Sequence, residues 1–366
     1  MNLLMISGDQ ELINGKKGPF YYLLQEFSKY WNRIDVICPS KNFKNLHKNF
    51  FTNVNAYDCP KNLLAIVEKA KIIFRESKFS LMTVHDYPPF LHSRAALAIK
   101  KLIKVPFVLE IHHIVGYPKA ADLKEFSLKL YFRLFFKKFS REALSIRVVN
   151  QHQVPYFLKN LGVPEEKIIY LPSFYINHEV FQPSNLDKIY DLLFVGRLVK
   201  NKGVSLLLEI CQKLKKEQPN YKMAIVGEGP IEDNLKSKIN QAGLANNVKF
   251  LGWLEDSEQL AKIYNQARIL LITSDNEGGP RVGLEALACG TPVISTRVGV
   301  MIDLIKEREI GFLVDWSVED FIDKIKFILN EPEFFNKFSG KRHKVIESFE
   351  YHKLIRDYAL ILQNLL

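Results

Sequence analysis

Short apolar runs alternate with helix-length amphipathic segments along almost the whole chain of 366 residues. Twelve of these runs have the length and the β-branched content of buried strands. They span 3–7, 34–38, 81–85, 107–112, 146–149 and 167–171 in the first half, and 192–196, 222–227, 248–252, 269–273, 292–295 and 311–314 in the second half. Strands that alternate with helices predict parallel sheets with crossover helices. Two series of about six strands therefore predict an α/β chain built from two doubly wound domains.

The length supports two domains, because 366 residues exceed what one ordinary core accommodates. The content of 47% apolar and 25% charged residues is typical of soluble globular proteins. The stretch 172–185 contains prolines and asparagines and is a plausible linker. We therefore expect a first domain over 1–175, a linker over 176–189, a second domain over 190–345, and a closing helix within 346–366.

The cysteines and the N-terminal segment favour the cytoplasm. Four cysteines are scattered along the chain without metal-ligand or redox spacing, which favours a reducing compartment. The first residues carry no basic leader, and their apolar run is too short for a signal peptide. No apolar segment approaches the ~18 residues needed to span a bilayer. We therefore expect a cytoplasmic protein.

The net charge of +11 lies entirely in the first half of the chain. Residues 1–184 contain 26 basic and 15 acidic residues, whereas residues 185–366 contain 25 of each. Such a bias favours an anionic partner. Because no RNA- or DNA-binding signature is present, we expect an anionic membrane surface or a phosphorylated acceptor rather than nucleic acid.

A basic, aromatic-rich segment over 120–144 predicts an amphipathic helix. Its candidate membrane- or acceptor-binding cations are Lys124, Lys129, Arg133, Lys137 and Lys138, and Lys16 and Lys17 in an early glycine loop share this assignment. Such a helix is typical of segments that lie on an anionic bilayer, here the inner face of the plasma membrane. A helix packed on the core, with a solvated basic face, is the alternative.

The stretch 277–285 places two acids around a predicted helix start. An apolar strand precedes it, helix formers follow it, and Pro280 suits the first helical position. The free N–H groups at such a helix start attract phosphate. Because carboxylates beside an anion site need another ligand, Glu277 and Glu285 are candidates for binding sugar or ribose hydroxyls.

Two further loops and one strand end also carry candidate residues. Gly196, Arg197 and Lys202 follow the first strand of the second half, and the forked Arg and compact Lys suit phosphate oxygens. The basic glycine loop 15–18 follows the first strand but lacks the dinucleotide and P-loop spacings. His112 ends a strand, where ligands of open α/β sheets bind. Solvated surface cations and a packed polar histidine are the alternatives.

Together these segments resemble glycosyltransferase family 4, the retaining nucleotide-sugar transferases. The resemblance rests on 194–203, 227–229, 250–252 and 277–294, and it is dense over about 190–315 and weaker over 1–175. It implies the GT-B architecture, in which two Rossmann-like domains face a central cleft. The first would be the acceptor domain and the second the nucleotide-sugar donor domain, with the final helix packing back on the first.

The resemblance also implies residue roles. Arg197 and Lys202 match the pair that holds the donor diphosphate. Glu277 matches the acid at the donor sugar, Glu285 the acid at the ribose hydroxyls, and His112 the donor-sugar histidine of the first domain. The remaining implied donor contacts are Gly15, Gly196, the backbone N–H groups of Val282, Gly283 and Leu284, and the base-binding segment of Gly252, Trp253 and Leu254.

The implied function is transfer of a hexose, with retention at the anomeric carbon, from a UDP- or GDP-sugar to a glycan or lipid-linked acceptor. Synthesis of a cell-surface polysaccharide or glycolipid is the expected setting. No cofactor and no metal is expected, because Arg197 and Lys202 supply the cations and no Asp-x-Asp motif is present. A GT-B-fold sugar-nucleotide epimerase, a phosphorylase and a non-catalytic nucleotide-sugar-binding protein are the alternatives.

Overall fold

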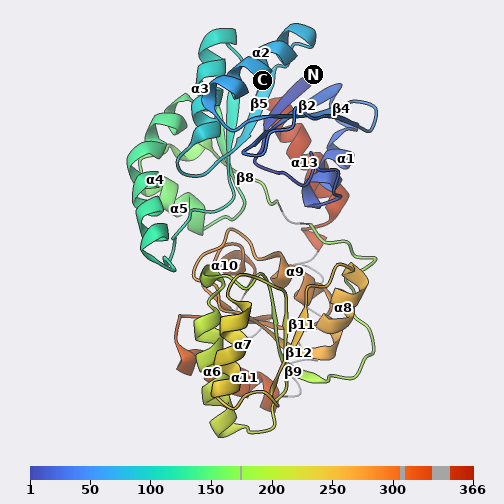
Figure 1. The fold of residues 1–366 in the computed structure, drawn as a ribbon, viewed down its shortest axis with the longest axis vertical. Coiled ribbons are helices and arrows are strands. Elements are labelled where there is room, and N and C mark those ends of the chain that lie inside the picture. The colour runs from blue at the N-terminus through green and yellow to red at the C-terminus, as the bar shows by residue number, and fades with distance from the viewer. Residues whose placement is uncertain (174, 306–309, 332–346) are drawn as a thin grey trace. The chain divides into compact units, whose positions relative to one another are not determined.

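The computed structural model describes residues 1–173, 175–305, 310–331 and 347–366. The chain divides into two compact units (Figure 1). Unit 1 consists of 1–114, 127–173 and 352–366, and unit 2 consists of 115–126 and 174–351. The chain therefore passes from one unit to the other four times.

Unit 1 is built around an eight-stranded sheet with the order β3-β4-β2-β1-β5-β6-β7-β8. Its strands are β1 (Asn2–Ile6), β2 (Arg33–Ser40), β3 (His47–Phe50), β4 (Val54–Pro60), β5 (Leu81–His85), β6 (Phe107–Ile111), β7 (Ser145–Val148) and β8 (Ile168–Tyr170). Neighbouring strands are parallel except for the antiparallel pair of β3 and β4. Its helices are α1 (Pro19–Phe27), α2 (Leu63–Glu76), α3 (Leu91–Ile103), α5 (Gln153–Asn160) and η1 (Glu165–Lys167), with most of α4 (Leu123–Glu142) and α13 (Tyr351–Asn364).

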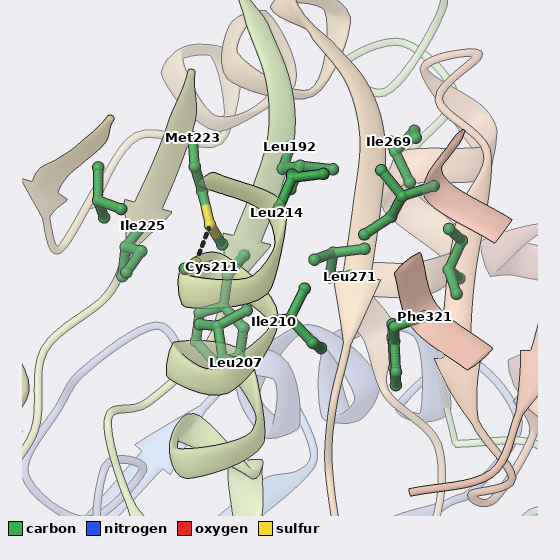
Figure 2. Packing of buried hydrophobic residues seen from close by; sticks show 14 of the residues in the cluster. Leu192, Leu207, Ile210, Cys211, Leu214, Met223, Ile225, Ile269, Leu271 and Phe321 are labelled. Atoms are coloured by element: carbon green, nitrogen blue, oxygen red, sulfur yellow. Dashed lines mark hydrogen bonds between the residues drawn. The ribbon is translucent and has the colours of Figure 1, made fainter. Parts of the chain in front are cut away.

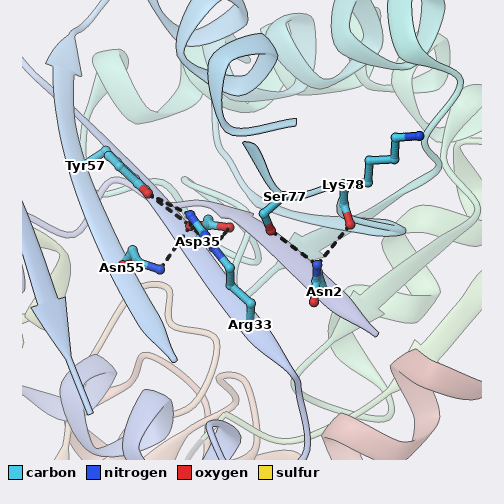
Figure 3. A network of polar contacts seen from close by, with 7 residues as sticks. All are labelled: Asn2, Arg33, Asp35, Asn55, Tyr57, Ser77 and Lys78. Carbon is cyan, nitrogen blue, oxygen red and sulfur yellow. Dashed lines mark hydrogen bonds and ion pairs between the residues drawn. The ribbon is translucent and has the colours of Figure 1, made fainter. Parts of the chain in front are cut away.

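A buried carboxylate links β2 to β4 in unit 1 (Figure 3). Asp35 has no exposed surface, and it pairs with the Arg33 guanidinium at 3.0 Å. Tyr57 and Asn55 on β4 donate hydrogen bonds to Asp35 Oδ1 at 3.2 and 3.3 Å. Buried charge is tolerated only when it is paired and hydrogen-bonded in this way. The network therefore explains why an aspartate stands inside an apolar strand.

Unit 2 contains a six-stranded parallel sheet with the order β11-β10-β9-β12-β13-β14. Its strands are β9 (Tyr190–Val195), β10 (Met223–Val226), β11 (Val248–Gly252), β12 (Ala267–Ile272), β13 (Val293–Thr296) and β14 (Gly311–Val314). Its helices are η2 (Lys200–Lys202), α6 (Val204–Glu217), α7 (Glu232–Gln241), α8 (Ser257–Gln266), α9 (Arg281–Ala288), α10 (Met301–Leu304) and α11 (Val318–Asn330).

The core of unit 2 follows from strand alternation (Figure 2). Leu192 on β9 and Leu271 on β12 belong to one apolar cluster, which also holds Leu207 of α6 and Phe321 of α11. Leu193, the next residue on β9, is fully buried but lies outside this cluster. Because successive side chains of a strand point to opposite faces, both faces of the sheet are covered.

All twelve predicted strands are confirmed to within two residues at each end. The count for the first half was too low, because β3 and β4 were missed. The four residues of β3 alternate between exposed and half-buried, and three of them are polar, so no apolar run marks the strand. β4 carries Asn55 and Asp58 between its apolar residues, which breaks its pattern.

The predicted domain limits can be compared with the two units. Residues 115–126 belong to unit 2 although they fall inside the first predicted domain, and the predicted linker 176–189 also belongs to unit 2. The predicted closing helix is observed as α13, which lies almost entirely in unit 1. Part of the predicted second domain, 306–309 and 332–345, lies outside the described residues. Within the described ranges, no helix combines the length and the apolarity needed to cross a bilayer.

Candidate active site

The predicted charged loops of unit 2 meet at one point of its sheet. From β9 the chain adds β10 and β11 on one side, and then β12, β13 and β14 on the other side. Ligands of open α/β sheets bind outside the carboxyl ends of the strands at such a reversal of order. The loops that follow β9 and β12 carry Arg197, Lys202 and Glu277, so the structure places these three predicted residues at the reversal point.

The loop after β9 presents Arg197 to solvent. Its side chain is exposed and makes no ion pair within the described part of the chain. The loop is held by its backbone, because the Gly196 N–H donates to the Val226 carbonyl at 3.0 Å. A Cβ on Gly227, which has a φ of +123°, would lie 2.1 Å from the Gly196 carbonyl oxygen. Gly227 therefore permits the close approach that fixes the position of the Arg197 loop.

Lys202 and Glu277 form a mostly buried ion pair. Lys202 Nζ lies 2.7 Å from Glu277 Oε1, and the two side chains are only 17% and 13% exposed. The Ser274 hydroxyl also donates to Glu277 Oε1. The Thr273 hydroxyl donates to the Lys202 carbonyl at 2.8 Å, which ties the η2 turn to the end of β12. The predicted phosphate cation and the predicted sugar acid are thus held against each other.

Gly203 makes this arrangement possible. It adopts a left-handed conformation with a φ of +66°, and a Cβ there would lie 1.8 Å from the Thr273 carbonyl oxygen. Any larger residue would force the turn away from β12. The close approach of this turn to the Thr273 carbonyl therefore explains why a glycine follows Lys202.

Residues 115–126 contact the loop that contains Glu277. Asn276, which is 1% exposed, donates to the Lys119 carbonyl at 2.9 Å and to Glu125 Oε2 at 2.8 Å. Lys119 Nζ also lies 2.9 Å from Asp275 Oδ1. These contacts give the two residues before Glu277 fixed partners.

Glu285 is buried inside α9 and has a partner at each oxygen. The Tyr264 hydroxyl donates to Oε2 at 3.0 Å, and Arg281 Nε lies 3.0 Å from Oε1. Burial raises the pKa of Glu285 above its ordinary value, although Arg281 and Tyr264 act in the opposite direction. Each carboxylate oxygen has two lone pairs, so these bonds leave capacity for a hydroxyl donor.

The start of α9 differs slightly from the prediction. Pro280 caps the helix rather than occupying its first helical position, and the helix begins at Arg281. The Gly283 N–H donates to the Pro280 carbonyl at 3.0 Å. One of the three N–H groups predicted for phosphate, on Val282, Gly283 and Leu284, is therefore already bonded within the turn.

The predicted base-binding segment lies at the end of β11. Gly252 adopts a φ of +68°, and Trp253 is 58% exposed. The Trp253 N–H lies 3.3 Å from Glu228 Oε1, which joins this segment to the glycine turn after β10. Leu254 follows in the same loop, outside any helix or strand.

In unit 1, His112 follows β6 and stacks on the His85 ring that ends β5, with 4.2 Å between ring centroids. His112 Nε2 lies 3.4 Å from Glu110 Oε2. Burial, followed by the His112 charge, lowers the pKa of His85 to about 3. His85 is therefore neutral at physiological pH.

Glu110 is the centre of a buried polar network. Arg147, which is 2% exposed, donates to Glu110 Oε2 at 2.9 Å, and the Tyr358 hydroxyl of α13 donates to Oε1. The Arg147 guanidinium also lies 3.8 Å from the centroid of the Tyr358 ring. Burial alone would raise the pKa of Glu110, but Arg147 and His112 hold it well below its usual range. The carboxylate behind His112 therefore stays ionised.

The remaining predicted residues lie at the surface of unit 1, except for Lys124, which is in the first turn of α4 and belongs to unit 2. Gly15 adopts a φ of +80°, and Lys16 and Lys17 beside it are exposed. On α4, Lys124, Lys137, Lys138 and Arg133 are exposed, and Lys129 is half-buried. Phe132, Phe136 and Phe139 of the same helix are buried. The predicted amphipathic helix is therefore confirmed, with one aromatic face packed against the core.

Several residues of the candidate site were missed at the sequence level. They are Ser274, Tyr264, Arg281, Glu110, Arg147 and Tyr358. Only the pair of Arg281 and Glu285 leaves a local signal, because charges four residues apart on a helix are neighbours. Within the described ranges, no group of three or more His, Cys, Asp or Glu side chains is placed to hold a metal ion.

Residues 177–347, which cover most of unit 2, match the family model described as glycosyl transferases group 1. This part of the chain is similar to the group 1 glycosyl transferases. The match contains Arg197, Lys202, Glu277 and Glu285, the four charged residues selected from the sequence.

Curated glycosyltransferases are also similar to parts of this chain. An uncharacterized glycosyltransferase of Haemophilus influenzae is 30% identical over 173 residues, which is 47% of this chain and 48% of the relative. A Campylobacter jejuni enzyme, named as an undecaprenol-linked glycan α-1,4-N-acetyl-D-galactosaminyltransferase, is 27% identical over 277 residues, covering 73% and 71%. The matches to the first four curated relatives span only 31–53% of the length of those proteins.

Solved structures extend the similarity to both units. Sucrose-phosphate synthase from Thermosynechococcus elongatus has a TM-score of 0.80 at 18% identity, with 100% of this chain and 98% of that chain covered. Anabaena HepE, solved in complex with UDP, has a TM-score of 0.73 at 17% identity over the whole of both chains. The predicted GT-B fold with two Rossmann-like units is thereby confirmed.

Proposed function

We propose that this chain is a retaining glycosyltransferase that moves a sugar from a nucleotide-diphosphate sugar to a glycan or lipid-linked acceptor. The observation that carries the proposal is the grouping of Arg197, Lys202 and Glu277 at the reversal point of the unit 2 sheet. UDP is the nucleotide in the solved HepE complex. The proposed acceptor class is based on the Campylobacter jejuni relative, whose name includes an undecaprenol-linked glycan.

In the proposed reaction, the bond between the anomeric carbon and the β-phosphate oxygen breaks, and charge develops on the leaving diphosphate. Arg197 and Lys202 would stabilise this charge more strongly in the transition state than in the ground state. Attack by the acceptor on the same face, with its proton passing to the departing phosphate, gives retention without an enzymic nucleophile. This chemistry requires no metal, because the two side chains supply the cations.

Glu277 and Glu285 would bind hydroxyls rather than act as an acid/base pair. Lys202 fixes the Glu277 carboxylate at 2.7 Å, beside the proposed diphosphate. Tyr264 and Arg281 fix the Glu285 carboxylate in the same way on α9. Carboxylates held in one geometry accept hydroxyl hydrogen bonds without losing further side-chain freedom on binding.

The direct test is a thermal-shift screen against UDP-, GDP- and ADP-sugars, followed by transfer assays with the stabilising donor. We expect one nucleotide to stabilise the protein and the product to keep the anomeric configuration of the donor. A product of inverted configuration would contradict the mechanism. Absence of any transfer or donor hydrolysis across the panel would contradict the enzyme assignment.

Replacement of Glu285 by alanine is expected to weaken binding of the stabilising nucleoside diphosphate about tenfold or more, because the ribose hydroxyls lose their acceptor. The measurement is calorimetric titration of the wild type and the variant with the nucleotide and with its 2′,3′-dideoxy analogue. The wild type should prefer the natural nucleotide, and the variant should bind both equally. Glu258→Ala, on the same unit, is the control. An unchanged preference in Glu285→Ala would exclude the ribose role.

We further propose that α4 lies on an anionic membrane surface. Leu123, Phe126, Leu130 and Leu134 are 84%, 54%, 49% and 67% exposed, and their spacing of three and four places them along one side of the helix. The exposed cations of α4 surround this stripe. Apolar and basic residues together bind anionic bilayers through burial of apolar area and charge attraction. Cell-surface polysaccharide or glycolipid synthesis at the inner face of the plasma membrane is the setting that we infer.

The double variant Leu130→Gln/Leu134→Gln should bind vesicles that contain 30% phosphatidylglycerol at least tenfold more weakly than the wild type. Vesicle sedimentation measures the partition coefficient. Burial of one leucine side chain contributes about 1.5–3 kcal/mol to the free energy of membrane binding. The control Leu64→Gln/Ile72→Gln changes two exposed residues of α2 and should bind as the wild type does. Equal binding by both variants, or equal binding to pure phosphatidylcholine, would contradict the proposal.

A further inference from the structure

Unit 1 contains a cavity of about 420 Å³ that none of the proposed donor or membrane contacts uses. It lies where β1, β2 and β4 end, and these are neighbouring parallel strands. The loop after β1, the loop after β2 and the end of β4 supply its lining. Ligands of open α/β sheets bind at this edge.

Asp58 supplies the feature that indicates a ligand. It lines the cavity, is 2% exposed, and accepts the Lys44 backbone N–H at Oδ2, at 2.7 Å. Its Oδ1 is buried and has no hydrogen-bond partner among the described residues. An unpaired buried acceptor costs about 1–3 kcal/mol, and the cost is larger for a charged group. A hydroxyl donor in the cavity would satisfy this oxygen.

Cations stand at the rim of the same cavity. Lys41, Lys44 and Lys61 line it, are exposed, and form no ion pair within the described ranges. The loop that carries them is anchored, because Ser40 accepts the Asn42 N–H at its hydroxyl at 3.0 Å and the Lys61 N–H at its carbonyl at 3.0 Å. Lysines bind phosphate as compact point charges. The rim therefore suits an anionic group, and the floor suits a hydroxyl.

We propose that this cavity binds a phosphorylated sugar or polyol, with the phosphate on the rim lysines and a hydroxyl on Asp58 Oδ1. The same chemistry occurs in free sugar phosphates and in the phosphorylated polyol headgroups of lipids. Binding itself is independent of the proposed transfer reaction, whereas the role of the bound molecule as acceptor rests on that proposed function. The lysines and the Asp58 carboxylate of the cavity thus predict an acceptor that is anionic and rich in hydroxyl groups.

The first test is calorimetric titration of the full chain with glucose 6-phosphate, glucose and inorganic phosphate, and flotation with phosphatidylcholine vesicles that contain either phosphatidylinositol or the same fraction of phosphatidylglycerol. The two anionic lipids have the same charge, so the proposed α4 contact should bind both equally. We expect glucose 6-phosphate to bind, or the phosphatidylinositol vesicles to bind more tightly than the phosphatidylglycerol vesicles, which identifies the free or the lipid source. Lys44→Gln/Lys61→Gln should weaken that binding at least tenfold. The control Lys78→Gln/Lys104→Gln removes two exposed cations of unit 1 outside the cavity and should change it less than twofold. Binding of neither probe, or equal weakening by both pairs, overturns the proposal.

The variant Asp58→Asn tests the proposed hydroxyl contact at Asp58 separately from the proposed phosphate contact at the rim lysines. It should weaken binding of glucose 6-phosphate, or of the phosphatidylinositol headgroup, while leaving inorganic phosphate affinity unchanged. Inorganic phosphate that binds as tightly as glucose 6-phosphate in the wild type would reduce the cavity to an anion site and overturn the assignment. If Asp58→Asn fails to fold, the lysine pair and its control still decide the outcome. Arg197→Ala in unit 2 should keep the glucose 6-phosphate affinity, so loss of transfer and loss of this site are distinguishable.

Discussion

Replacement of Arg197 by alanine is expected to lower turnover about 10²–10³-fold, which corresponds to a few kcal/mol of lost transition-state stabilisation. The exposed guanidinium has no partner acid in the described ranges, so its removal leaves no stranded charge. The effect should therefore fall on kcat more than on donor affinity. Steady-state kinetics with the true donor measure both. Lys249→Ala, an exposed cation elsewhere in unit 2, is the control and should retain wild-type turnover.

Lys202 should behave differently because it is paired. Lys202→Ala leaves the mostly buried Glu277 carboxylate without its cation, so it is expected to lose turnover and to misplace Glu277. A cycle of Lys202→Ala, Glu277→Gln and the double variant should be strongly non-additive, as is usual for residues in contact. Near wild-type turnover in Arg197→Ala or in Lys202→Ala would contradict the proposed role of that residue in stabilising the leaving diphosphate.

Arg147→Met is expected to destabilise unit 1 by about 3–5 kcal/mol, because it strands the buried Glu110 carboxylate. The chain has two units, so global unfolding need not be two-state. Hydrogen exchange of the β6 and α13 amides is therefore the appropriate measurement. The double variant Glu110→Gln/Arg147→Met removes both charges and should recover much of the loss. Exchange rates unchanged in Arg147→Met would contradict the importance of the pair.

The same network predicts an acid dependence of stability. The pKa of Glu110 is lower in the folded protein than the ordinary value of about 4.3 in an unfolded chain. Its contribution to the free energy of unfolding is therefore complete above about pH 4.3 and decreases as the pH falls below that value. Glu110→Gln should remove this part of the pH dependence, which exchange measured between pH 3 and pH 6 would detect.

The sequence predicted the parts of the molecule that depend on local pattern. Each of the twelve apolar runs became a strand, and the charges of Arg197, Lys202 and Glu277 were found because they follow such runs directly. β4 was not predicted, because its polar residues have partners that only the folded sheet supplies. The side-chain amide of Asn55, for example, donates a hydrogen bond to Asp35 across the β2–β4 pair.

The supporting contacts of the candidate site could not be predicted for the same reason. Tyr264 reaches Glu285 from 21 residues away, Arg147 reaches Glu110 from 37, and Tyr358 reaches Glu110 from 248. Such pairs leave no periodic or local signal in the chain. They are formed by sheet order and helix packing, which set the surroundings of each carboxylate after the strands have assembled.

Because the chain passes between the units four times, the order in which the units become complete differs from the order in which they begin to be synthesised. Domains ordinarily fold as units, N-terminal first, while the chain is being made. Here residues 352–366 belong to unit 1, and Tyr358 among them is a partner of Glu110. Unit 2 has all its residues once position 351 has been synthesised, whereas unit 1 is complete only after residues 352–366 have left the ribosome. The half that is translated first is therefore completed last.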